Sequence, residues 1–298
     1  MINKLVIFGV GLIGGSFARG LKKAGAVRHI VGVDRSEAAA QRAVELGIVD
    51  EAGGPEAVRG ADLVLLATPV AQTGPILAAL LPWLDSHTIV TDAGSTKSDV
   101  VAAARAALGA RVAQFVPGHP IAGRETNGPD AAIDDLYVGK KFVVTPLAEN
   151  PPAAVDRVTD AWRACGAIIH RLTPGEHDKV FASVSHLPHL LAYALVDDIA
   201  NKPHADLLFQ YAASGFRDFT RIAGSSPEMW RDISMANRVA LLAELDAYMA
   251  QLTQLRAQLA AGDGAGLEAV YGNAQRARRN WIEAIEAAEA PPPQDTAE

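Results

Sequence analysis

The sequence predicts an α/β fold, with a doubly wound parallel sheet in residues 1–172 and an all-α domain in residues 173–289. Near the N-terminus an apolar strand runs directly into a glycine-rich turn, and the order strand, loop, helix then recurs along the first half of the chain. After about Thr173 the strand signals stop, and apolar residues recur with helical spacing. We expect the last segment, residues 290–298 with its Pro-Pro-Pro run, to be a disordered tail.

The glycine-rich turn reads Gly9-Val10-Gly11-Leu12-Ile13-Gly14 and follows the apolar residues 5–8, which suit a strand buried on both faces. In this pattern the first glycine permits a tight turn, the second lets the backbone approach a pyrophosphate, and the third lets the following helix pack closely on the strand. Free N–H groups at the N-terminus of that helix then face the anion. The pattern predicts a Rossmann-type dinucleotide site made by Gly9, Gly11, Leu12, Ile13 and Gly14. The alternative is a plain strand–helix turn whose glycines serve packing only.

A second predicted strand, residues 29–33, ends at Asp34, about twenty residues beyond the glycine turn. A carboxylate at this position can bond both ribose hydroxyls of NAD and would repel the 2′-phosphate of NADP. The neighbouring Arg35 carries a guanidinium that could pair with such a phosphate. NAD is therefore the expected cofactor, and NADP use stays open. The alternative for Asp34 is a solvated carboxylate at a strand end.

The rest of the first domain repeats the same order of elements. Helices are predicted for residues 36–46, for the segment through Leu77, Leu80 and Leu81, and for residues 98–108 and 153–163; strands are predicted for residues 61–67, 88–91, 141–145 and 167–170. Ligands of such sheets sit beyond the carboxyl ends of the strands. We therefore expect the loops at Gly9, Thr68, Gly94 and Gly118 to converge on one crevice, with Thr68 and Pro69 beside the cofactor.

Helical periodicity in the second domain predicts helices over residues 207–213, 227–251 and 267–289, in addition to an apolar stretch around residues 190–196. These segments are too apolar for a thin single layer of helices in water. We expect them to pack against a second subunit as well as the first domain, which makes a homodimer.

Charge and composition exclude several classes of partner. The formal net charge is −7 and no basic patch stands out, so nucleic acid is not an expected partner. No apolar run is expected to reach the length of a membrane span, and no signal peptide is expected, because the sequence starts directly with its first predicted strand. The single cysteine, Cys165, cannot form an internal disulfide. We expect a cytoplasmic protein that acts on a small molecule.

Two strand-end loops carry side chains that suit proton transfer. His119 lies between a glycine and a proline where the crevice is expected, and histidine titrates in the range that lets it take a hydroxyl proton during hydride transfer. The alternative is a loop histidine satisfied by the local backbone. Ser95, with Thr96 and Lys97, would reach the same crevice from the neighbouring strand end, or would serve simply as a helix cap.

The helical half carries a third cluster of polar residues. His186 and His189 could suggest a metal, but Pro188 between them and the lack of a third nearby ligand on the same run argue against one, so no metal site is predicted. Arg217 and Arg221 lie one helical turn apart, and one of them could clamp a substrate carboxylate as a bidentate donor. The alternative is a salt-bridged surface helix, which suits Arg217.

Together these motifs resemble the prephenate/arogenate (cyclohexadienyl) dehydrogenases of tyrosine biosynthesis. Besides the glycine turn, the resemblance rests on Asp-Ala-Gly-Ser-Thr-Lys from Asp92, Gly-His-Pro-Ile-Ala-Gly-Arg-Glu from Gly118, Ser-His-Leu-Pro-His-Leu from Ser185, Gly-Phe-Arg-Asp-Phe-Thr-Arg-Ile-Ala from Gly215 and Met-Trp-Arg-Asp from Met229. These runs occur in the order of the family, and the resemblance reaches from residue 1 to about residue 285. It implies a Rossmann domain followed by a helical dimerisation domain, and the NAD-dependent oxidative decarboxylation of prephenate to 4-hydroxyphenylpyruvate.

The resemblance also implies roles for single residues. His119 matches the residue that hydrogen-bonds the ring hydroxyl of prephenate and accepts its proton, and Ser95 matches the serine that orients both. Arg221 matches the arginine that binds a substrate carboxylate, and His189 matches a histidine near the substrate side chain. The remaining matches are Glu125 and Asp218 at gate and support positions and Trp230 near the dimer interface. At a position that varies in the family, Arg124 adds a cation that would favour a dianionic substrate.

The two carboxylates of prephenate require local cations on an anionic protein, and Arg221, Arg124 and Lys97 are the candidates. Arogenate carries an amino group in place of the keto group, and an arogenate-specific dehydrogenase stays open as an alternative.

Two more remote alternatives share the predicted fold. A β-hydroxyacid dehydrogenase would use a lysine on the helical domain, where this chain has His186 and His189. A non-catalytic NAD-binding sensor would keep the cofactor site without bringing His119, Ser95 and Arg221 together.

Overall fold

The computed structural model describes residues 1–124 and 126–289. The chain forms two compact units, Met1–Leu242 and Ala243–Glu298, of which the second is described as far as Glu289. The first unit holds every strand given below and the helices up to the start of the long C-terminal pair. The domain boundary predicted after residue 172 lies inside this unit and stays a prediction, and the predicted tail, residues 290–298, lies outside the described residues.

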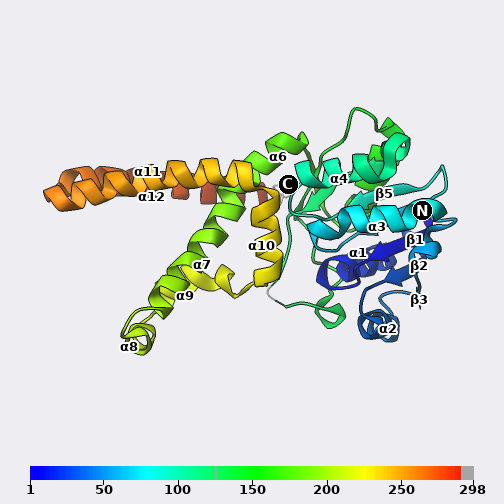
Figure 1. The fold of residues 1–298 in the computed structure, drawn as a ribbon, viewed down its shortest axis with the longest axis horizontal. Helices are drawn as coiled ribbons and strands as arrows, with labels where there is room; N and C mark the ends of the chain where they lie inside the picture. The colour runs from blue at the N-terminus through cyan, green and yellow to red at the C-terminus, as the bar shows by residue number, and fades with distance from the viewer. Residues whose placement is uncertain (125, 290–298) are drawn as a thin grey trace, which may run out of the picture. The chain divides into compact units, whose positions relative to one another are not determined.

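Six parallel strands form the main sheet in the order β3-β2-β1-β4-β5-β6 (Figure 1). The strands are β1 (Ile2–Phe8), β2 (Val27–Val33), β3 (Glu51–Ala52), β4 (Leu63–Leu66), β5 (Ile89–Asp92) and β6 (Phe115–Val116), and the helices between them are α1 (Leu12–Lys23), α2 (Glu37–Glu45), α3 (Thr73–Leu80) and α4 (Ser98–Leu108). The strand order reverses at β1, which pairs with β2 on one edge and β4 on the other. This is the predicted doubly wound arrangement, and ligands are expected outside the carboxyl ends of β1 and β4.

Alternate residues of the central strands enter two apolar cores, one on each face of the sheet. In β1, Leu5 and Ile7 pack in one core with Phe17 of α1, and Val6 and Phe8 pack in the other core with residues of α3 and α4. A strand covered by helices on both faces must be apolar at every position rather than at every second one. The run of apolar residues in β1 follows from this burial, as the sequence predicts.

A second, three-stranded sheet carries the segment after β6, which we expected in the same parallel sheet. Its order is β7-β8-β9: β7 (Gly118–Pro120) is antiparallel to β8 (Lys141–Val144), and β9 (Ile168–Arg171), which follows α5 (Pro152–Ala164), is parallel to β8. Pro117 accounts for the separation, because it has no N–H with which to extend the ladder of the main sheet. The next N–H, that of Gly118, donates to the Asp92 carboxylate instead (3.0 Å).

The helical part begins with α6 (Pro174–Phe181), a turn of π-helix (Ala182–His186) and α7 (Leu187–Ala200). It continues with α8 (Ala205–Gln210), α9 (Ser214–Thr220), α10 (Pro227–Ala236), α11 (Arg238–Ala261) and α12 (Gly264–Glu289). The single helix predicted for residues 227–251 is thus two helices, α10 and α11. They are separated at the buried Asn237, whose side-chain amide donates to the carbonyl oxygen of Asp178 in α6 (2.7 Å).

The π turn lets one helix run through Pro188. A proline has no N–H and clashes with the preceding turn of a regular α-helix, and the wider turn directly before it accommodates the ring. Residues Pro174–Ala200 therefore form one helix that is long and apolar enough to cross a membrane, with a mean hydropathy of 1.2. The expectation that no segment reaches this length is wrong. One such helix is weak evidence for a membrane span, because a core helix of a soluble protein meets the same criterion.

Candidate active site

A cavity of about 800 Å³ lies outside the carboxyl ends of the main sheet. It is lined by residues at the ends of four strands: Gly9 after β1, Asp34 after β2, Thr68 after β4 and Gly94 after β5. Three of the four loops that we expected to converge therefore do so. The fourth, at Gly118, belongs to the second sheet and does not line this cavity.

Most residues assigned to the cofactor line this cavity. They are Gly9, Gly11, Ile13, Asp34, Arg35, Thr68 and Pro69. Leu12 and Gly14 are buried behind the turn. Segments without a phosphate-binding signal in the sequence also contribute to the wall. They include residues 127–129, the face of α3 that carries Pro75, Ile76 and Ala79, and the face of α10 that carries Met229, Asp232 and Ile233.

The three glycines of the turn are constrained by different neighbours. At Gly9, φ is +89° and a Cβ would lie 2.4 Å from the carbonyl oxygen of Ala67; at Gly14, a Cβ would lie 2.1 Å from the carbonyl oxygen of Gly9. Both positions therefore require glycine for the fold itself. A Cβ at Gly11 would meet only the backbone of Gly128, at 3.9 Å, so this position faces open space that a ligand can fill.

The start of α1 has the properties of an anion site. Its N-cap is Gly11, no side chain caps the helix, and the first turn carries no acidic residue. The N–H groups there are available to a pyrophosphate. Asp34 is held beside this turn, because its carboxylate accepts the N–H of Val10 (3.2 Å) and that of Ser36 (3.0 Å). These residues fit a dinucleotide with free ribose hydroxyls.

A buried ion pair joins the loop after β5 to β7. The Lys97 ammonium, which is fully buried, donates to the Asp92 carboxylate and to the carbonyl oxygen of Gly118 (2.8 Å). The same carboxylate accepts the N–H of Gly118 (3.0 Å) and that of Gly94 (2.8 Å). Lys97 is therefore committed to the fold, and our expectation that it could bind a substrate carboxylate is wrong.

His119 is half-buried in β7 and directly follows Gly118, whose backbone is bonded to the ion pair. Its Nδ1 lies 2.9 Å from Nε2 of His177, and Nδ1 of His177 lies 2.9 Å from the Asp178 carboxylate. The ring of Phe181 packs against both imidazoles, with ring centroids 4.9 Å and 4.4 Å away. Burial lowers the pKa of His119 well below its usual value, and the nearby His177 and Lys97 lower it further.

His177 and Asp178 were not singled out from the sequence. The only local signal is the capping box at the start of α6, in which Thr173 and Glu176 bond each other's backbone N–H groups. That box predicts where the helix begins, but it carries no information on what the helix contacts. Only the fold reveals that the first turns of α6 reach β7.

Of the remaining residues assigned to the substrate, His189, Asp218 and Arg221 lie on the helical part, Arg124 lies in the segment after β7, and Glu125 lies outside the described residues. The His189 ring stacks on Trp230, with centroids 3.5 Å apart, and its Nδ1 donates to the carbonyl oxygen of Ser185 (2.8 Å). Burial lowers the pKa of His189, and Arg221 is near enough to lower it too. Trp230, expected near a subunit interface, is buried within this chain.

For the other residues assigned to the site, the structure gives the exposure but few contacts. Asp218 and Arg124 are exposed, and Glu125 lies outside the described residues. Ser95 is half-buried and lines the large cavity. No hydrogen bond joins Ser95 to His119 in the described chain, although the Lys97 contact with Gly118 brings their loops together.

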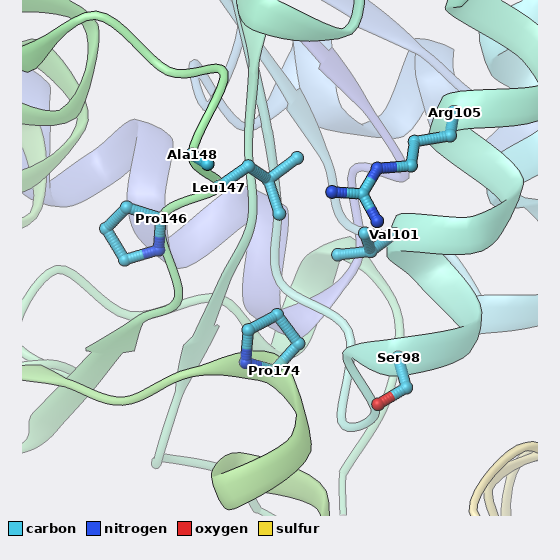
Figure 2. Close-up of a pocket in the computed structure, with 7 residues that line it drawn as sticks. All are labelled: Ser98, Val101, Arg105, Pro146, Leu147, Ala148 and Pro174. Carbon is cyan, nitrogen blue, oxygen red and sulfur yellow. The ribbon is translucent and has the colours of Figure 1, made fainter.

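A smaller cavity of about 320 Å³ lies between α4 and the segment after β8 (Figure 2). Arg105 is its charged lining residue, and Leu147 faces that side chain across the space. The Arg105 guanidinium is already paired with Glu149 (3.0 Å). This cavity therefore offers no group for proton transfer. Within residues 1–124 and 126–289, no cluster of histidine, cysteine or carboxylate side chains is arranged to hold a metal ion.

A glycine turn at the switch point of a parallel sheet, with an acidic residue at the end of β2, defines the protein as a Rossmann-type dinucleotide-binding protein whose site suits NAD. The match to family models is more specific. Residues 17–171 match the prephenate dehydrogenase nucleotide-binding domain, and residues 173–272 match the prephenate dehydrogenase dimerization domain. The chain belongs to the prephenate dehydrogenase family.

Individual relatives agree with this assignment. The cyclohexadienyl dehydrogenase of Zymomonas mobilis is 38% identical, over 93% of this chain and 96% of its own length, and the prephenate dehydrogenase of Bacillus subtilis is 35% identical, over 90% and 73%. The structure of Aquifex aeolicus prephenate dehydrogenase with hydroxyphenyl propionate and NAD⁺ has a TM-score of 0.84 at 35% identity, covering 96% of this chain and 99% of that one. Synechocystis arogenate dehydrogenase has a TM-score of 0.79 at 32% identity, covering 93% and 99%.

Two alanine substitutions should separate the glycine that the fold needs from the glycine that the cofactor needs. In Gly14→Ala the new Cβ overlaps the Gly9 carbonyl oxygen, and overpacking of this kind costs about 1–3 kcal/mol, so Tm should fall by several degrees. In Gly11→Ala, Tm should stay unchanged while the Kd for NAD rises roughly tenfold or more, because the methyl group occupies the path of the pyrophosphate. Thermal unfolding and NAD titration measure both. If Gly11→Ala binds NAD normally, the pyrophosphate does not pass this glycine.

Proposed function

We propose that this protein is an NAD-dependent prephenate dehydrogenase, which oxidises and decarboxylates prephenate to 4-hydroxyphenylpyruvate in tyrosine biosynthesis. The observation that carries the proposal is the place of His119, a neutral imidazole held in β7 beside the loop whose Ser95 lines the cofactor cavity. Membership of the prephenate dehydrogenase family supports the same substrate.

NAD, when bound, supplies the acceptor for the hydride that leaves the carbinol carbon of the ring. In the proposed reaction His119 accepts the proton of the same hydroxyl group. The bond between the ring and its carboxylate then breaks to release CO₂, and its electron pair makes the ring aromatic and leaves negative charge on the ring oxygen, to which the proton returns. Aromatisation drives the reaction, so the protein contributes mainly positioning and proton acceptance.

We assign supporting roles to residues around this base. Ser95 orients the imidazole and the substrate hydroxyl, Arg221 binds a substrate carboxylate, and His189 lies beside the substrate side chain. The proximity of Arg221 to His189 supports placing the two at one end of the substrate. Arg124 is the candidate for a second carboxylate contact, now that Lys97 is excluded. For Glu125 and Asp218 the gate and support roles rest on the family resemblance alone.

The amino-acid arogenate is the second candidate substrate, because relatives of similar identity include an enzyme named for arogenate and one named for the wider cyclohexadienyl class. Steady-state assays with prephenate and arogenate, each with NAD and NADP, test both choices. We expect the highest kcat/KM with prephenate and NAD. The expected preference for NAD follows from the Asp34 carboxylate at the end of β2, and the expected preference for prephenate follows from the family. Faster turnover of arogenate, or of NADP, would overturn the corresponding half of the proposal.

The proposed roles of His119 and Arg221 predict different kinetic defects, one in kcat and the other in KM. His119→Asn keeps a polar side chain but no base, so kcat should fall by about 10²–10⁴-fold with little change in NAD affinity. Arg221→Ala removes a charge-assisted hydrogen bond, which contributes about 1.5–3 kcal/mol, so the KM for prephenate should rise roughly ten- to a hundred-fold. Equal effects of both variants on kcat and KM would contradict the division of roles.

The pH dependence gives a further measurement on the same enzymes. A base must be neutral to accept a proton, and burial lowers the pKa of His119 below its usual value. Activity should therefore persist below pH 6.5, about where an unperturbed histidine would already be half protonated, and fall only as the pH drops through the lower pKa. The His119→Asn variant should lack this acid limb.

We also propose that the protein is a cytoplasmic homodimer. The family model that matches residues 173–272 describes a dimerization domain, and large apolar side chains are exposed on the helical part when the chain is considered alone. They include Leu207, Phe209, Tyr211, Val239, Met249 and Leu259. Light scattering at micromolar concentration should return twice the 31.3 kDa of one chain. A mass of one chain would overturn the proposal.

A further inference from the structure

We infer that Asp178, acting through His177, holds His119 in the tautomer that carries its proton on Nδ1 and leaves the Nε2 lone pair for the substrate. The inference rests on the proposed role of His119 as the base. It makes His177 and Asp178 positioning residues: neither is assigned contact with the substrate, and both act through the imidazole of His119.

The chain of contacts begins at a carboxylate with fixed partners. Asp178 accepts the backbone N–H groups of Lys97 and Ser98, each at 2.8 Å, in addition to the imidazole of His177 at 2.9 Å. Burial raises the pKa of Asp178, but the hydrogen bonds from His177, Ser98 and Lys97 outweigh it, and the pKa is lowered overall. Asp178 is therefore ionised and can only accept hydrogen bonds.

Each partner then fixes the next. Because Asp178 has no proton to give, Nδ1 of His177 must carry the hydrogen of their 2.9 Å contact. Burial lowers the pKa of His177, so this ring is neutral and its Nε2 is a hydrogen-bond acceptor. The 2.9 Å contact between that Nε2 and Nδ1 of His119 therefore needs its hydrogen on His119. In a neutral imidazole the other nitrogen, Nε2 of His119, is then the basic one.

The surroundings favour this arrangement over its alternatives. A protonated His177 would donate from both nitrogens and force the opposite tautomer on His119. The carboxylates of Asp178 and Asp92 favour that cation, but burial, together with the Lys97 ammonium nearby, outweighs them and lowers the pKa of His177. His186, the other histidine facing the pair, is neutral as well, since burial lowers its pKa to about 4. Phe181 packs against the rings of both His119 and His177 and limits their rotation.

The same contacts help the base after it has accepted a proton. The imidazolium of His119 donates from Nδ1 to the neutral His177, whose own N–H donates to the Asp178 carboxylate. These two hydrogen bonds stabilise the new positive charge on His119. In serine hydrolases a single carboxylate orients the catalytic histidine in this way. Here a second imidazole stands between the carboxylate and the base.

Substitutions of His177 test the inference without removing the carboxylate. Asp178 is unsuitable, because it also binds the first N–H groups of α4 and its loss would unsettle the fold. His177→Asn keeps a donor for Asp178 but leaves Nδ1 of His119 without an acceptor. His177→Gln places an amide oxygen near the position of the lost Nε2 and can accept from His119. The control is His87→Asn, an exposed histidine outside this chain of contacts.

We expect His177→Asn to lower kcat about ten- to a hundred-fold, the worth of one hydrogen bond to a charged group, while the KM for substrate and the Kd for NAD stay near wild type. His177→Gln should recover part of the loss, and His87→Asn should behave as wild type. Wild-type kcat in His177→Asn would overturn the inference. Equal loss in the Asn and Gln variants would also overturn it, because a purely structural role of His177 predicts that result.

A spectroscopic measurement separates this inference from the proposed function. Nitrogen-15 shifts of labelled histidine distinguish the two neutral tautomers, and the His119 signal is identified by its loss in His119→Asn. At neutral pH we expect the proton on Nδ1 in the wild type and a shift toward Nε2 in His177→Asn. A proton on Nε2 in the wild type overturns the inference, whatever the enzyme turns over. Failure of the proposed function would appear separately, as a wild-type protein that oxidises neither prephenate nor arogenate.

Discussion

The buried ion pair between Asp92 and Lys97 is the interaction on which the arrangement of the site depends. Two charges without water are costly to bury, and removing one partner of such a pair costs about 3–5 kcal/mol. Here every charged atom has hydrogen-bond partners, and the backbone of Gly118 is held through both its N–H and its carbonyl oxygen. The pair therefore fixes the first residue of β7, and with it the position of His119, against the end of β5.

The two halves of the site use different parts of the protein. Around the glycine turn, cofactor binding depends on backbone groups and on a cavity wall shared by four strand ends and α10. Around His119, the chemistry depends on side chains that α6 brings to the second sheet. The helical part contributes to both halves: α10 lines the cofactor cavity with Met229 and Ile233, and α6 brings His177 to His119. A movement of α6 and α10 together would thus affect both cofactor binding and proton transfer.

Local signals in the sequence were enough to predict β1, β2, β4 and β5 of the main sheet, whereas no range was predicted for the two-residue strands β3 and β6. The glycine turn, the apolar run of β1 and the cap at Ser36 are each set by neighbours in the chain, and α4 has the predicted bounds of residues 98–108. The second sheet was not predicted, because Pro117 acts through a missing hydrogen bond rather than through a pattern. The role of Lys97 was mistaken for a similar reason. A buried lysine and an exposed one look alike in sequence, and only the contact with Asp92 distinguishes them.

The π turn at Ala182–His186 has a consequence for how this segment can change over evolution. Such a turn is one residue inserted into an α-helix, and each residue of an α-helix turns the chain by about 100°. His177 precedes the turn and His189 follows it, so the inserted residue sets the angle between the two side chains. Deletion of a single residue here would rotate one histidine away from its present neighbours and return Pro188 to a regular helix. The length of this turn is therefore constrained, and so is His186 within it, whose buried imidazole lies 3.0 Å from the side-chain amide of Asn237.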